Sequence, residues 1–153
     1  MIKYVCLDMD GTIADLYGQE NWLERLNRFN PSPYRNASAL WDMNRLSDIL
    51  CAFQKKNIKV AIITWLSKKS TPEFSALTRK AKRDWLNAHG IPYDLFFGIP
   101  YGECKADCVR SLLEMNEEAI LADDDPKARN TWQLGKTIDP TICNLLDELE
   151  NLV

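Results

Sequence analysis

The chain has 153 residues, of which 46% are hydrophobic and 27% charged, with a formal net charge of −3. This balance is typical of one globular domain and excludes a disordered or collagen-like chain. A chain of this length buries enough surface to fold without disulfides or a structural metal. The part from residue 101 onward is strongly acidic. We therefore expect no nucleic acid polymer as a partner.

Two further features limit the class of protein. No apolar run approaches the roughly 18 residues of a membrane-spanning helix, and the run before Asp8 is too short for a signal peptide. The five cysteines are scattered and form no C-x-x-C pair, which argues against a disulfide framework and a zinc site. We expect a cytoplasmic protein with reduced thiols, a monomer or homodimer, that has no membrane partner.

The chain alternates predicted strands and helices. Short apolar runs predict three buried parallel strands, over residues 2–7, 58–63 and 118–122. Helical periodicity and capping signals predict helices over residues 40–56, 71–89, 105–115, 126–134 and 140–152. Such alternation predicts an α/β fold, a Rossmann-like parallel sheet with helices on both faces, in a single domain over residues 1–153.

A segment at about 14–48 interrupts this alternation. It contains a short helical stretch over residues 20–29, and the Asn30-Pro31-Ser32-Pro33 sequence that follows should end any helix. We interpret the segment as a small helical cap inserted over the sheet edge. Its many aromatic side chains, together with Trp65, either pack the insertion onto the sheet or stack on a planar substrate group. We assign Trp65 to substrate binding.

Acidic residues follow the predicted strands. The first strand runs into Asp8-Met9-Asp10-Gly11-Thr12, the second into Thr64, and the third into Asp123-Asp124-Asp125. Because ligands bind beyond the carboxyl ends of parallel strands, we expect these side chains to share one crevice. Converging carboxylates need a cation, and oxygen ligands without histidine or thiolate favour Mg²⁺. The sequence therefore predicts a magnesium site at this edge of the sheet.

With Lys105 at a predicted helix start, these motifs resemble those of the haloacid dehalogenase superfamily of aspartate-nucleophile phosphatases. The resemblance extends from Asp8 to Asp125. The small insertion and the Asp-Asp-x-Pro form of the last motif are most similar to the 5′-deoxyribonucleotidase-like branch.

The resemblance implies a role for each motif residue. Asp8 is the nucleophile that forms an aspartyl phosphate, and Asp10 is the general acid and then the base. The Asp8 carboxylate, the Asp10 backbone carbonyl and Asp124 hold Mg²⁺, with Asp123 in support. Thr64 and Lys105 bind phosphoryl oxygens, and Lys105 also restrains Asp8.

Two other residue assignments follow from the helical patterns. Lys80 or Lys82 could take the place of Lys105. A basic cluster could attract an anionic substrate, but we expect it to be a solvated helix face; its members are Lys68, Lys69, Arg79, Lys80, Lys82 and Arg83. Asp125 precedes Pro126 and should cap the next helix rather than bind metal.

The expected function is Mg²⁺-dependent hydrolysis of a small phosphomonoester, with a nucleoside monophosphate as the favoured substrate of a 5′-nucleotidase. One alternative is a receiver-like protein, which the order of the motifs disfavours. The other is a phosphate-binding relative without turnover, and the presence of both Asp8 and Asp10 counts against it.

Overall fold

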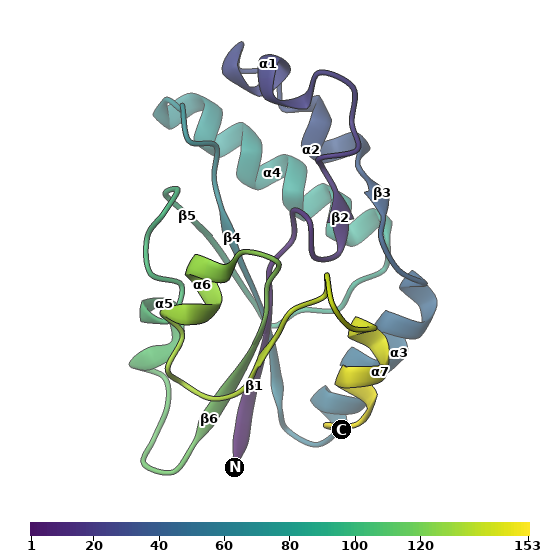
Figure 1. The fold of residues 1–153 in the computed structure, drawn as a ribbon, viewed down its shortest axis with the longest axis vertical. Helices are drawn as coiled ribbons and strands as arrows, with labels where there is room; N and C mark the ends of the chain where they lie inside the picture. Colours follow the sequence, from purple (N-terminus) through teal and green to yellow (C-terminus); the bar gives the residue numbers. More distant parts are fainter.

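A computed structural model describes all residues from Met1 to Val153. Five parallel strands form one sheet in the order β5-β4-β1-β6-β7 (Figure 1). The strands are β1 (Ile2–Leu7), β4 (Lys59–Trp65), β5 (Leu95–Ile99), β6 (Glu118–Ala122) and β7 (Thr137–Ile138). The predicted α/β class with a parallel sheet is confirmed.

The three predicted strands lie in the centre of this sheet, and the two that the sequence pattern missed are its edges. Edge strand β5 is only half-buried and contains Gly98, so it lacks the long apolar run of a central strand. Edge strand β7 has two residues and exists because it pairs with Leu121 and Ala122 of β6. Both strands depend on a neighbouring strand more than on their own sequence.

Helices cover both faces of the sheet (Figure 1). Helices α3 (Met43–Lys55) and α7 (Leu145–Glu150) pack with Val5 and Leu7 of β1 in the larger core. Helices α5 (Asp107–Arg110) and α6 (Pro126–Asn130) pack on the opposite face in a second core. Successive residues of a strand point to opposite faces, which is why the single strand β1 contributes to both cores.

Helix α4 (Pro72–Ala88) begins as predicted, because the Thr71 side chain accepts a hydrogen bond from the Phe74 backbone N–H. The three predicted helices beyond residue 100 are shorter than expected. After α6, for example, Trp132 turns into the core and its Nε1 donates to the Ala119 carbonyl at 2.7 Å. Helix α6 therefore ends before Trp132, because burying the indole is more favourable than continuing the helix that the sequence pattern predicts. No helix of the structure is long and apolar enough to cross a membrane.

The segment predicted as an insertion forms a two-stranded ribbon and two short helices beside α4 (Figure 1). Its elements are β2 (Ala14–Asp15), α1 (Trp22–Asn27), α2 (Ser32–Asn36) and β3 (Ser38–Ala39). Helix α1 ends at Asn27, before the Asn30–Pro33 sequence predicted to end it. That sequence then leads into α2, since Pro33 sits in its first turn, where no N–H is needed. From residue 43 onward the chain belongs to α3 and packs on the sheet.

Candidate active site

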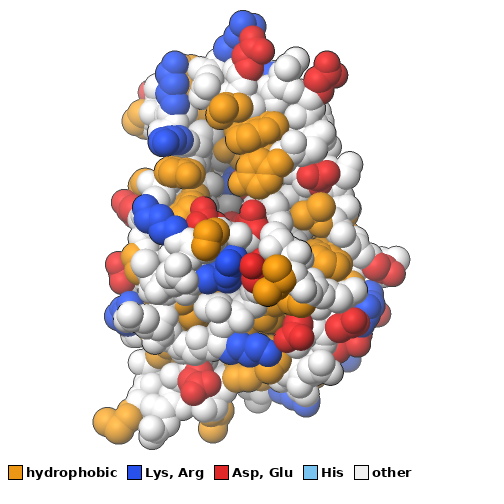
Figure 2. All heavy atoms as spheres, in the orientation of Figure 1, with side chains coloured by type: hydrophobic (Ala, Val, Ile, Leu, Met, Phe, Trp, Pro, Cys, Tyr) orange, Lys and Arg blue, Asp and Glu red, His pale blue; other side chains and the backbone are white.

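A cavity of about 270 Å³ lies between the carboxyl ends of the strands and the insertion. Figure 2 shows acidic side chains at the bottom of a hollow, with hydrophobic side chains above it. The acids come from the residues that follow β1 and β6. The apolar wall comes from the insertion, from residues 65–66 and from Tyr101. The cavity therefore combines a charged floor with an apolar entrance.

The strand register brings the acids together. Leu7 of β1 pairs with Ala122 of β6, and the Asp8 backbone N–H donates to the Ala122 carbonyl at 3.0 Å. Asp8 and Asp123 are thus neighbours although 115 positions separate them. Their meeting at one edge agrees with the expectation for parallel strands.

The loop after β1 closes tightly over the floor. Gly11 has a φ of +80°, and a Cβ at this position would lie 2.8 Å from Cγ of Asp124, so only glycine fits. The buried Thr12 hydroxyl lies 3.0 Å from Oδ2 of Asp8 and 3.2 Å from Oδ1 of Asp124. It also accepts a hydrogen bond from the Asp124 backbone N–H at 3.1 Å. Thr12 thereby fixes both carboxylates.

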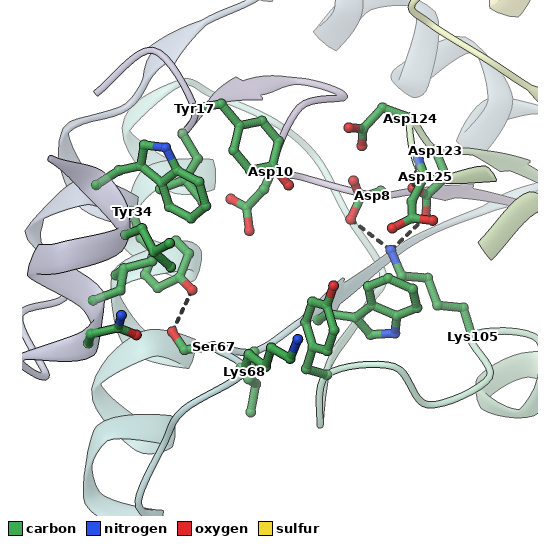
Figure 3. A pocket seen from close by; sticks show the side chains of 18 residues that line it. Asp8, Asp10, Tyr17, Tyr34, Ser67, Lys68, Lys105, Asp123, Asp124 and Asp125 are labelled. Atoms are coloured by element: carbon green, nitrogen blue, oxygen red, sulfur yellow. Dashed lines mark hydrogen bonds and ion pairs between the residues drawn. The ribbon is translucent and has the colours of Figure 1, made fainter. Parts of the chain in front are cut away.

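Lys105 lies beside the carboxylates of Asp8 and Asp123 (Figure 3). Its Nζ donates to Oδ1 of Asp8 at 2.7 Å and to Oδ2 of Asp123 at 2.6 Å, and its side chain is 1% exposed. Burial lowers the pKa of Lys105, but the two carboxylates outweigh it and the net pKa is raised. Lys105 therefore stays charged and holds Asp8, as the resemblance of the motifs implies.

Asp8, Asp123 and Asp124 each place a carboxylate oxygen within 4.8 Å of the others. Burial, and then the charge of Asp8, raises the pKa of Asp123 to about 7 and that of Asp124 to about 8. One lysine does not neutralise three acids. Because all the donors are hard oxygens, the cluster fits a divalent cation such as Mg²⁺. The Asp10 carboxylate is not part of this cluster.

Lys82 of α4 holds Asp10 instead. Its Nζ donates to Oδ2 of Asp10 at 2.9 Å, to the Thr64 hydroxyl at 2.5 Å and to the Trp65 carbonyl at 2.9 Å. The same nitrogen lies 4.6 Å from the centre of the Tyr34 ring. Burial raises the pKa of Asp10, although the charge of Lys82 opposes the shift.

The prediction that the basic residues of α4 face solvent is therefore wrong for Lys82, whose side chain is 1% exposed. Lys80, by contrast, is exposed and pairs with Asp84. A signal existed in the sequence. Lys82 follows Thr78 by four residues and precedes Trp85 by three, so helical periodicity places it on the buried face.

The remaining predicted residues divide between the cavity wall and the interior. Trp65 lines the cavity, and its Nε1 donates to the Glu103 carbonyl at 2.9 Å. Thr64 is fully buried behind the cavity, with its hydroxyl bonded to Lys82. Asp125 caps α6 by accepting from the Lys127 backbone N–H at 2.8 Å, so its predicted structural role is confirmed.

No family model matches the chain, and no curated protein matches it. Two solved structures of the Pnkp1/Rnl/Hen1 complex, an RNA repair complex, are similar to it. Their TM-scores are 0.61 and 0.59, each at 16% sequence identity and with 90% of this chain covered. The chain spans only 44% and 41% of the chains that it matches.

These matches correct the functional predictions. Similar structures from an RNA repair complex contradict the identification as a haloacid dehalogenase-like nucleotidase and the small-molecule phosphatase function. They do not support the two alternatives either. The exclusion of a nucleic acid partner is contradicted as well.

The errors have physical causes. Strand-end acids indicate metal and phosphate chemistry but not the leaving group, and an aromatic surface stacks on a base whether or not that base belongs to a polymer. Overall charge is also a poor guide to one local contact. The chain thus shares the fold of part of a protein from an RNA repair complex.

Proposed function

We propose that this protein is a Mg²⁺-dependent phosphatase that removes a terminal phosphate from RNA. The observation that carries the proposal is the buried Asp8 carboxylate on the cavity floor, fixed by Lys105 and Thr12 and flanked by Asp10. RNA as the substrate is supported by the similarity to structures from an RNA repair complex. An apolar entrance above an acidic floor suits a nucleoside that carries a phosphate.

Asp8 and Asp10 divide the chemistry. A carboxylate oxygen of Asp8 attacks phosphorus, so that a bond from Asp8 to phosphorus forms and the bond from phosphorus to the ribose oxygen breaks. Asp10 points into the cavity beside Asp8 (Figure 3) and donates a proton to the departing ribose oxygen. Asp10 then accepts a proton from a water molecule whose oxygen attacks phosphorus, so that the bond from Asp8 to phosphorus breaks and phosphate leaves. Burial of Asp10 raises its pKa, which favours the protonated form that the first step needs.

The carboxylates of Asp8 and Asp124, with the backbone carbonyl of Asp10, are the ligands that we propose for Mg²⁺. Asp123 supports them, since its two oxygens accept hydrogen bonds from Lys105 and from the Asp125 backbone N–H. Bound Mg²⁺ offsets the negative charge of the carboxylates and of the phosphate.

The apolar wall gives the terminal nucleoside a surface to bind. Tyr17 and Trp22 meet edge to face with ring centres 5.1 Å apart, and both line the cavity together with Trp65. Aromatic rings of this kind stack on any base, because every base has a π-face. We therefore expect little preference for one base.

The test is phosphate release from RNA oligonucleotides that carry a 3′- or a 5′-terminal phosphate, compared with nucleoside monophosphates. We expect release from one RNA end in Mg²⁺, none in EDTA, and a kcat/KM for RNA about tenfold or more above that for the mononucleotide. Asp8→Asn is the control for contaminating phosphatase. If neither RNA end releases phosphate in the presence of Mg²⁺, the proposal is overturned.

A further inference from the structure

A second cleft continues from the candidate active site. Four residues, Leu66, Ser67, Lys68 and Tyr101, line both hollows. Beyond them the second cleft runs over the start of α4 as far as Arg79. A ligand that leaves the cavity past Tyr101 therefore enters this cleft without crossing a ridge of other residues.

The second cleft carries positive charge that no acid neutralises. Lys68 and Arg79 are its only charged lining residues. The Nζ of Lys68 lies 5.6 Å from the centre of the Tyr101 ring and forms no ion pair. Arg79 donates from Nε to the Gly98 carbonyl at 3.1 Å, which anchors the side chain and leaves both terminal nitrogens without a protein partner. Two free cations beside a cavity for a terminal phosphate indicate a further anionic group of the same ligand.

Hydroxyl groups complete the lining of the cleft. Ser70 and Ser75 lie with their oxygens 2.8 Å apart, and Ser67 bonds to Tyr34 at the junction with the cavity. Cations with neutral hydroxyl donors are the groups that proteins use to contact a nucleic acid backbone. They carry no base preference.

Another cleft borders the cavity along α1, but its charge differs. There Arg28 pairs with Glu24 at 2.8 Å, so that only Lys69 remains unneutralised. The α4 cleft is thus the more favourable path for a polyanion. Tyr101, 51% exposed and 5.2 Å from the Trp65 ring, offers a stacking surface where that path begins.

We propose that single-stranded RNA extends from the active site across Tyr101 into this cleft, where Lys68 and Arg79 bind the backbone phosphate next to the terminal one. The inference rests on the proposed function and adds a second nucleotide subsite to it. It implies that the enzyme distinguishes an RNA end from a mononucleotide by this contact.

The experiment compares kcat/KM for a phosphorylated RNA oligonucleotide with kcat/KM for p-nitrophenyl phosphate. We expect Arg79→Gln to lower the ratio of the two about tenfold. We also expect it to reduce the salt dependence of the RNA reaction, by about 0.7 in the log–log slope for one lost phosphate contact with a single strand. Arg83→Gln is the matched control, because Arg83 lies exposed on the same helix, forms no ion pair and lines neither cleft. Its ratio should equal that of the wild type.

Two results would overturn the subsite while leaving the phosphatase intact. One is an unchanged ratio for Arg79→Gln, and the other is a larger loss for Lys69→Ala, which would place the strand along α1. If no ester is hydrolysed, the proposed function fails instead. In that case the affinity for phosphorylated RNA tests the subsite. Equal affinities of the wild type and Arg79→Gln would overturn the proposed subsite.

Discussion

Two buried lysines divide the acids of the site between them. Lys105 holds Asp8 together with Asp123, and Lys82 holds Asp10. Each lysine comes from a different part of the chain, and each contacts one of the two acids that we propose as catalytic. Separate partners allow two neighbouring carboxyl groups to differ in protonation, as a nucleophile and a general acid must.

Asp8→Asn should slow phosphate release by about three orders of magnitude or more, because an amide is a poor nucleophile. The amide has nearly the same shape as the carboxylate, so the fold should be kept. The far-ultraviolet circular dichroism should not change. Steady-state kinetics on phosphorylated RNA measure the loss. Residual kcat/KM within tenfold of the wild type would contradict the role of Asp8.

Lys82→Met should slow hydrolysis of an RNA terminal phosphate about 100-fold and that of p-nitrophenyl phosphate less than tenfold. The reason is that Lys82 positions Asp10, and the nitrophenolate leaving group needs little protonation. Lys80→Met, which removes an exposed lysine of the same helix, is the control and should change neither rate. Equal losses on both esters, or a loss explained by a collapsed Tm, would show that Lys82 acts only in the fold.

At the scale of an element, the turn from β6 into α6 gives three consecutive aspartates three tasks. Asp123 bonds to Lys105, Asp124 lies beside Thr12 and Asp8, and Asp125 caps the helix. The chain changes direction at each residue between a strand end and a helix start. Identical side chains therefore face a lysine, the proposed metal and a helix N-terminus.

Asp125→Ala and Asp124→Ala should accordingly have different effects. Loss of the cap should lower the free energy of unfolding by about 0.5 to 2 kcal/mol with little change in the Mg²⁺ concentration required for activity. Asp124→Ala should instead raise that Mg²⁺ concentration about tenfold or more, since it removes a proposed ligand. Chemical denaturation and Mg²⁺ titration of the activity measure the two effects. The opposite ranking would contradict the assignment of this turn.

At the scale of the whole molecule, the acidic floor makes stability depend on pH. The pKa values of about 7 for Asp123 and about 8 for Asp124 lie above the ordinary 3.8 of an aspartate. Between about pH 4 and 8 the folded protein therefore holds more protons than the unfolded chain. By linkage, the free energy of unfolding falls as the pH rises through this window.

Mg²⁺ should raise the Tm more at pH 8 than at pH 6, because it competes with protons for its proposed ligand Asp124. Thermal unfolding with Mg²⁺ or EDTA at the two pH values measures the difference. Asp124→Asn, which cannot ionise, should reduce it. An equal Mg²⁺ effect at both pH values, or none at either, would contradict the metal site.

Local sequence patterns were enough to predict the central strands, the long helix and the acids at the strand ends. The runs before Asp8 and Asp123 are apolar enough to be buried strands in any α/β arrangement, and Thr71-Pro72 marks a helix start through local hydrogen bonding. Because parallel strands share a carboxyl edge, their alternation with helices also predicted that Asp8 and Asp123 would meet.

The edge strands, helix α2 and the partner of Asp10 depend on contacts that form only in the folded chain. Strands β5 and β7 form because a neighbouring strand offers hydrogen bonds, which no local pattern encodes. Lys82 reaches Asp10 across 72 positions of sequence and also donates to the buried Thr64 hydroxyl. A buried charge takes the partner that strand register and helix packing bring within reach, so such pairings follow from the assembled fold and not from the spacing of motifs.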